Sequence, residues 1–292
     1  MRIGTRRSQL ALAQANWTAD ALRAQGHEVE LVEMVTSGDR GASPSDKAGL
    51  KGLFVAEIVR ALQDGDVDVA VHSAKDLPSE DPEGIVVAAV PEREKPWDLL
   101  ITRDGELPQG AVVGTVSLRR RGQLLRMRPD VRVVELRGNV DTRLSKVADG
   151  TVDATLLAAA GLSRLGIEPE HAEALSVEQM VPAPGQACLA LQTRVGEEDL
   201  LGPLDHEPSR VAYTAERTVM DLLGGGCALP LGAFATVEDG GTVSLNAVVF
   251  EPDGSNLVRW EAAGPDPEDV AAEVHAGLLS VGAEEILAKV LG

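Results

Sequence analysis

The sequence predicts an α/β protein with two similar doubly wound α/β domains that flank a cleft, followed by a small α+β domain with antiparallel strands. Strand-like and helix-like segments alternate over the first two-thirds of the chain. A short Asp-Gly motif that connects a helix to a strand, at residues 64–68, recurs 85 residues later at residues 149–153. The last third instead has three strands joined by glycine-containing turns typical of hairpins. At roughly 100–200 residues per domain, the 292 residues provide for two or three domains.

The first domain follows a strand–helix–strand order that predicts a parallel sheet. Strands are expected at residues 2–4, 28–35 and 67–72, and helices at 8–26 and 54–62. Ser8 opens the first helix, whose apolar residues are Leu10, Ala13, Trp17 and Leu22. Residues 36–50 show no periodicity, which predicts a long functional loop.

The second domain repeats the first. When the two domains are aligned with an offset of 85 residues, Val55 corresponds to Val140 and Leu77 to Leu162. The turn at residues 4–8 resembles residues 114–118, at an offset of 110 residues. Two sister domains normally face each other across a ligand-binding cleft. We expect the first domain to comprise residues 1–90 and 186–205, and the second to comprise residues 91–185.

The third domain, residues 206–292, is expected to combine antiparallel strands with helices. The strands are predicted at 233–237, 242–250 and 257–262, and the helices at 209–223, 267–279 and 284–291.

Acidic residues outnumber basic residues by 46 to 27, which gives a formal net charge of −19. A field of this sign repels polyphosphate and excludes a general DNA- or RNA-binding protein. Adaptation to a salt-rich cytosol, with an acidic proteome, and GC-rich codon usage explain this composition equally well.

The two cysteines, Cys188 and Cys227, do not form a disulfide framework, so we expect a cytoplasmic protein. The short apolar patch near the N-terminus is interrupted by Gln9 and Gln14, unlike a secretory signal. The longest uncharged stretch, residues 222–237, contains Pro230 and several glycines, which excludes a membrane-spanning helix there.

Positive charge gathers in residues 111–146, which hold eight arginines and one lysine against three acidic residues, a local net charge of +6. Because the arginine fork binds carboxylate or phosphate bidentately, this segment predicts an anion site. Four arginines adjoin small or polar residues at predicted strand-to-helix turns, where helix N-termini also attract anions. They are Arg119, Arg120, Arg137 and Arg143, whereas Arg126 and Arg128 are expected on a solvated helix face.

Polar residues follow the buried strand at 67–72. Asp76 and Lys75 come at its carboxyl end, where side chains point into the ligand crevice of an α/β sheet. Asp76 is either a site carboxylate or half of a turn ion pair with Lys75. His72 is expected to be a core histidine.

Three glycines precede Cys227, which allows a bulky group to approach its thiol closely. A covalent attachment site, a nucleophile and a buried structural cysteine are all compatible with this pattern. No metal-ligand spacing accompanies it, so no metal is expected. Cys188 lies in an apolar strand-like run and is expected to be structural.

Several of these stretches together resemble the porphobilinogen deaminase family, also called hydroxymethylbilane synthases. They are residues 5–12, 51–55, 72–78, 114–120, 136–144, 160–165, 184–186 and 225–227, and they span nearly the whole chain. The sequence departs from the pattern at several positions. Ser37 stands where many members have Arg, Gly224 where an acidic residue is common, and Lys95 and Trp97 where Asp and Arg are expected. The loop at residues 40–50 also differs in composition.

The resemblance implies a transferase of porphyrin and heme biosynthesis. Such an enzyme polymerises four porphobilinogen molecules head to tail into hydroxymethylbilane, with release of ammonia, on a dipyrromethane cofactor. That cofactor is held by a thioether to a cysteine that Cys227 matches. The implied fold is periplasmic-binding-protein-like, with porphobilinogen as the small-molecule partner, no nucleic acid or membrane partner, and a monomeric state. The alternative is a non-catalytic intracellular carboxylate-binding protein, since two-domain proteins with an arginine-lined cleft also bind solutes.

The resemblance also assigns roles to residues. Asp76 matches the catalytic acid, whose carboxylate would stabilise the cationic azafulvene left by loss of ammonia. The arginines would neutralise the carboxylates of the growing chain. The residues that match cofactor-binding groups are Lys75, Asp76, Thr115, Ser117, Arg119, Arg120, Arg137, Gly138, Gln186 and Cys227. Those that match substrate-binding groups are Arg6, Ser8, Lys51, Arg143 and Arg164.

Overall fold

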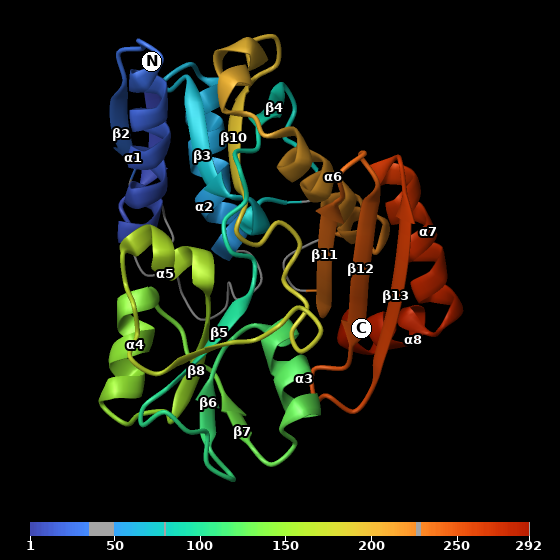
Figure 1. Ribbon diagram of the computed structural model, residues 1–292. Coiled ribbons are helices and arrows are strands. Elements are labelled where there is room, and N and C mark those ends of the chain that lie inside the picture. Colours follow the sequence, from blue (N-terminus) through green and yellow to red (C-terminus); the bar gives the residue numbers. More distant parts are fainter. Residues whose placement is uncertain (35–49, 79, 226–228, 292) are drawn as a thin grey trace.

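The computed structural model describes residues 1–34, 50–78, 80–225 and 229–291, which form three sheets with helices packed against them (Figure 1). The loop predicted at residues 36–50 lies outside the described residues except for its last one. Within the described ranges, no helix combines the length and the apolar character needed to cross a bilayer.

The first sheet is built from the N-terminal part of the chain and one later strand. Its strands are β1 (Arg2–Arg6), β2 (Glu30–Met34), β3 (Val69–Ser73), β4 (Ile85–Ala89) and β10 (Leu189–Arg194), in the order β2-β1-β3-β10-β4. Helices α1 (Gln9–Ala24) and α2 (Leu50–Gln63) connect the first three strands, and the short 3-10 helix η2 (Ala74–Asp76) follows β3. Ser8 caps α1, because its hydroxyl accepts a hydrogen bond from the backbone N–H of Ala11 at 3.2 Å.

The second sheet has the same topology as the first. Its strands are β5 (Asp98–Thr102), β6 (Val112–Gly114), β7 (Arg132–Val134), β8 (Ala154–Ala158) and β9 (Ala172–Ala174), in the order β7-β6-β8-β5-β9. Its helices are α3 (Leu118–Met127), α4 (Val140–Ala148) and α5 (Ala159–Leu165). Strand β6 takes the place of β1, β7 of β2, β8 of β3, β5 of β10 and β9 of β4, with the same relative directions. The predicted pair of similar α/β domains is confirmed.

The repeated Asp-Gly motif makes equivalent contacts in the two sheets. Asp68 Oδ2 accepts a hydrogen bond from the backbone N–H of Arg2 at 2.7 Å, and Asp153 Oδ2 accepts one from Val112 at 2.8 Å. In return, the backbone N–H of Asp68 donates to the carbonyl oxygen of Arg2, and that of Asp153 donates to the carbonyl oxygen of Val112, both at 2.8 Å. Each aspartate therefore fastens the start of β3 or β8 to the neighbouring strand.

The expected parallel arrangement holds for only three strands of each sheet. Strands β2, β1 and β3 are parallel, as are β7, β6 and β8, whereas β10 and β5 run antiparallel to both of their neighbours. The chain crosses between the sheets at residues 90–97 and 175–188. Because β5 and β10 enter through these crossings, the local strand–helix–strand alternation holds no information about their direction.

The third sheet is antiparallel, as its hairpin turns predict. It contains β11 (Leu231–Val237), β12 (Val243–Phe250) and β13 (Leu257–Gly264), accompanied by α6 (Glu207–Leu222), α7 (Pro267–Ser280) and α8 (Ala283–Leu291). The short 3-10 helices η3 (Glu198–Leu200) and η4 (Gly202–Leu204) connect β10 to α6. Figure 1 shows this domain, in orange and red, lying beside the other two.

The buried face of α1 differs from the prediction. Trp17, placed among the apolar positions of this helix, is 48% exposed. The face that packs against the sheet is instead formed by small and polar residues, namely Gln14, Ala15, Thr18 and Ala19, together with Leu22. Small side chains suit this position because the helix lies close to the sheet, while the predicted apolar series followed residue type alone.

Glu216 of α6 joins the three domains. It is fully buried, and its carboxylate accepts hydrogen bonds from Arg93 at 2.6 Å and from the backbone N–H groups of Gly185 and Ala235, both at 2.7 Å. Arg93 and Gly185 belong to the two crossing segments, and Ala235 belongs to β11. The third domain thus fixes both connections between the α/β domains.

Candidate active site

A cavity of about 690 Å³ opens where the three domains meet. The turns that follow β1, β3, β6, β7 and β8 form its walls, so the carboxyl ends of parallel strands from both sheets surround it. The crossing segment at 183–188 closes one side. Met220, Leu229 and Leu231 of the third domain add an apolar wall. The expected cleft between sister domains is therefore present.

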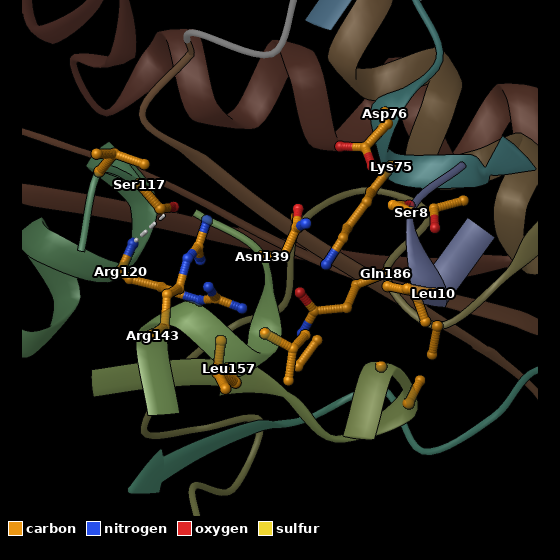
Figure 2. A pocket seen from close by; sticks show the side chains of 18 of the residues that line it. Ser8, Leu10, Lys75, Asp76, Ser117, Arg120, Asn139, Arg143, Leu157 and Gln186 are labelled. Atoms are coloured by element: carbon orange, nitrogen blue, oxygen red, sulfur yellow. Dashed lines mark hydrogen bonds between the residues drawn. The ribbon is translucent and has the colours of Figure 1, made fainter. Parts of the chain in front are cut away.

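Strand β3 brings Lys75 and Asp76 to this cavity. The strand ends at Ser73, and η2 carries both residues at the cavity lining. Figure 2 shows the Lys75 side chain extending from η2 towards Gln186, with Asp76 next to it. Burial lowers the pKa of Arg143 on α4, and the Asp76 charge opposes that shift. Asp76 therefore acts electrostatically across the cleft, on a residue of the other domain.

Helix N-termini add positive potential to the lining. Ser8 begins α1, and Ser117 caps α3 by accepting a hydrogen bond from the backbone N–H of Arg120 at 3.4 Å. Asn139 precedes α4, and all three residues line the cavity. Because helix N-termini attract anions, the cavity suits a ligand with several carboxylates.

Arg119 and Arg120 line the cavity, yet they also form a buried cluster with Asp98. Asp98, fully buried at the start of β5, accepts from Arg119 at 2.6 Å and from Arg120 at 2.7 Å. Arg119 also donates to the carbonyl oxygen of Val181 at 2.7 Å, and Arg120 to that of Leu156 at 2.9 Å. The three side chains carry one positive charge in excess, so the cluster holds α3 in place while keeping the wall cationic.

Replacing Arg119 by Leu is expected to lower the free energy of unfolding by about 3–5 kcal/mol, because it breaks a buried ion pair and leaves Asp98 with one partner. Burial alone would raise the pKa of Asp98, but the two guanidinium groups outweigh this effect and lower the pKa to about 2. Since this lies below the usual 3.8, the pairing stabilises the protein above that pH and the stabilisation is lost as the pH falls towards 2. Urea unfolding across this pH range measures both effects.

Arg126→Leu, on the exposed face of the same helix, is the matched control. Equal stability of the two variants, with an unchanged acid profile in Arg119→Leu, would contradict the assignment of Asp98 as a buried ion-pair partner.

The remaining arginines of the lining are held less tightly. Arg143 Nε donates to the carbonyl oxygen of Gly138 at 2.9 Å, and Arg164 Nη2 donates to that of Ala187 at 2.6 Å. Arg137 is exposed, 3.5 Å from Glu135. Backbone carbonyls and an exposed carboxylate are partners that a ligand carboxylate can displace.

The buried residues near the site are not reactive groups. Cys188 is 1% exposed and free, and burial raises the pKa of its thiol to about 11. Burial lowers the pKa of His72 to about 4, against the opposing charge of Asp76, so this histidine is neutral. Both agree with the structural roles expected for them.

Most of the predicted site residues meet at this one cavity. Its lining includes Arg6, Ser8, Lys75, Asp76, Ser117, Arg119, Arg120, Arg137, Gly138, Arg143, Arg164 and Gln186. Thr115 lies beneath the lining at 5% exposure, where its hydroxyl accepts a hydrogen bond from the Ser117 N–H at 3.2 Å. The Lys51 side chain and Cys227 lie outside the described residues. Leu229, close after Cys227 in sequence, lines the cavity.

Several lining residues were not singled out from the sequence. They include Gln14, Ser73, Asn139, Leu157 and Met220. One signal was available: Gln14 follows Leu10 by four residues, so a polar side chain shares a helix face with an inward-facing one.

Comparison with known proteins identifies the family. The sequence model of the "porphobilinogen deaminase, dipyromethane cofactor binding domain" matches residues 1–202, and that of the "porphobilinogen deaminase, C-terminal domain" matches residues 211–280. The chain belongs to the porphobilinogen deaminase family. Porphobilinogen deaminases of Brevibacillus brevis and Desulforudis audaxviator are each 47% identical over 99% of this chain and 97% of theirs. That of Thermus thermophilus is 43% identical over 99% and 98%.

Among solved structures, the chain is similar to a nutrient binding protein from Burkholderia cenocepacia bound to methionine, with a TM-score of 0.42 and 15% identity over 68% of this chain and 86% of that one.

As a porphobilinogen deaminase, the protein joins four porphobilinogen molecules head to tail, with release of ammonia, into hydroxymethylbilane, a step of porphyrin and heme biosynthesis. It does so on a dipyrromethane cofactor, which its matched N-terminal region binds. The alternative of a non-catalytic carboxylate-binding protein has no support in these matches.

Proposed function

We propose that Asp76 is the catalytic residue of this deaminase and that the cavity holds the cofactor and the growing chain. The observation that carries the proposal is the meeting, at one cavity, of the Lys75–Asp76 turn from the first sheet and the arginines of the second. In this arrangement the Asp76 carboxylate faces a wall that binds carboxylates. It can stabilise the cation formed when a substrate ring loses ammonia and can exchange protons with that ring.

The lining has the chemistry that a dipyrromethane requires. When bound, this group supplies the pyrrole to which the first substrate is joined. Ser117 offers a donor for its carboxylates, and Leu157, Met220 and Leu229 offer apolar surface for its rings. We place it between α3, α4 and the third domain, beside Gly138 at the turn before α4. Arg119, Arg120, Arg137, Gln186 and Lys75 complete this set, with Thr115 supporting Ser117 from below.

We propose Cys227 as the attachment point of the cofactor. Leu229, two residues after Cys227 in the sequence, lines the cavity and supports this assignment. Cys188 is buried with a raised pKa, which leaves Cys227 as the thiol suited to alkylation.

Substrate recognition is proposed for the side of the cavity nearest α1 and α5. Arg6 and Ser8 line it from the turn after β1, and Arg164 lines it from α5. Lys51, whose side chain lies outside the described residues, and Arg143 complete the proposed set.

Replacing Arg143 by Leu is expected to stall chain growth. A lost hydrogen bond between charged groups is worth about 1.5–3 kcal/mol, so the affected addition slows by about 10- to 100-fold. Intact mass spectra taken during a single turnover should then show accumulation of species with few added pyrroles.

Arg126→Leu removes an arginine of equal charge from an exposed position outside the cavity and should leave the series of species unchanged. Identical distributions in the Arg143→Leu protein and the wild type would exclude Arg143 from carboxylate binding.

We further propose three domains. The first comprises residues 1–90 and 186–205, the second residues 91–185, and the third residues 206–292. The membership of β10 in the first sheet supports the return of the chain at residue 186. A cytoplasmic monomer without nucleic acid or membrane partners fits the free Cys188 thiol and the net charge of −19, which repels polyphosphates and anionic lipids.

A further inference from the structure

A buried hydrogen bond joins α1 to the turn that carries Asp76. Gln14 is 4% exposed, and its Nε2 donates to the hydroxyl oxygen of Ser73 at 2.8 Å. Ser73 is the last residue of β3 and directly precedes η2. Both side chains line the cavity, so the bond forms part of the wall beside Asp76.

Three serines line the cavity at positions that precede helices, and one behaves differently. The hydroxyls of Ser8 and Ser117 accept hydrogen bonds from the backbone of their own helices. Ser73 precedes η2 with the extended backbone of a capping residue, but its side chain makes no capping bond. Its hydroxyl accepts from Gln14 instead.

The donation from Gln14 determines where the Ser73 proton is directed. A hydroxyl has one proton and two lone pairs, and the Gln14 amide occupies one lone pair. The proton is therefore directed away from Gln14. Among the described residues, the Ser73 hydroxyl forms a hydrogen bond with Gln14 alone. Ser73 also lines the cavity, so the cavity is the space open to its proton.

We propose that Gln14 is a positioning residue that directs the Ser73 proton into the cavity, where it donates to a carboxylate of the porphobilinogen ring held at Asp76. The inference rests on the proposed role of Asp76. Porphobilinogen carries an acetate and a propionate, and their carboxylate oxygens can accept a hydrogen bond from this hydroxyl. Lys75, two residues after Ser73 on the same turn, places a cation near the same carboxylate.

The test uses the polarity of this hydrogen bond in the holoenzyme, with porphobilinogen as the probe. Gln14→Glu would accept the Ser73 proton and withdraw it from the cavity, so KM should rise by more than about 10-fold with kcat within about twofold. Gln9→Glu is the matched control, because Gln9 is an exposed residue of the same lining without a bond to Ser73. It reports the effect of the added charge alone, and an equal KM in the two variants would overturn the proposal.

Coupling between the two residues separates orientation from structural support. Ser73→Ala is expected to raise KM about 10-fold and Gln14→Leu about 5-fold, whereas the double variant should stay near 10-fold. Effects that multiply to about 50-fold, or losses in kcat with KM unchanged, would contradict the proposal.

If the Gln14 variants fold poorly, Ser73 alone decides: Ser73→Thr keeps the hydroxyl and should keep KM within about twofold, and an unchanged KM in Ser73→Ala would overturn the proposal. A normal turnover in Asp76→Asn would instead refute the proposed role of Asp76, so the two failures are distinguishable.

Discussion

Asp76→Asn is expected to lower kcat by about 10³-fold while leaving the protein folded and its cofactor attached. General acid–base catalysis contributes about 10²–10⁴-fold, and electrostatic stabilisation of a developing charge contributes about as much. Asn keeps the shape of the side chain but has neither the charge nor the titratable proton. Steady-state assays with porphobilinogen measure the loss, and urea unfolding checks that the fold is unchanged.

Asp66→Asn, at an exposed position before β3, removes the same charge away from the cavity and serves as the control. Wild-type turnover in Asp76→Asn would refute the assigned role. Loss of the cofactor from that variant would show that Asp76 acts in cofactor assembly instead.

Cys227→Ser is expected to reduce turnover to background. Chain growth begins on the dipyrromethane, and a serine hydroxyl is a far weaker nucleophile than a thiolate at neutral pH, so the cofactor cannot be anchored. Cys188→Ser is the matched control, because that thiol is 1% exposed and has its pKa raised to about 11. Turnover should persist in this second variant, apart from any loss of stability caused by a buried hydroxyl.

The repeated domains were predictable because their signal is local. The Asp-Gly motif ends a helix and starts a strand within a few residues, and Asp68 and Asp153 use it for equivalent contacts. The directions of β5 and β10 were not predictable in this way. They depend on crossings between domains, which no short pattern encodes.

The position of the site followed from the same local logic. Asp76 follows β3 of the first sheet and Ser117 follows β6 of the second, each at the carboxyl end of a parallel strand, and the expected cleft between sister domains brings these two ends together. The local charge pattern singled out Arg119, Arg120, Arg137 and Arg143, and the resemblance to the family added Arg6 and Arg164.

The pairing of the arginines with Asp98 did not follow from the sequence. Asp98 lies 21 residues before Arg119 and reaches it because β5 enters the second sheet from a domain crossing. The orienting contact between Gln14 and Ser73 spans 59 residues and is equally long-range. Contacts of this kind need the three-dimensional arrangement of both partners.

The measurement that most directly tests this account is the intact mass of the denatured protein. The wild type should be heavier than its 30.7 kDa polypeptide by a dipyrromethane unit. The unit should remain in Asp76→Asn and Cys188→Ser, and it should be absent from Cys227→Ser. A wild-type mass equal to that of the bare polypeptide, or an adduct that persists in Cys227→Ser, would contradict the account.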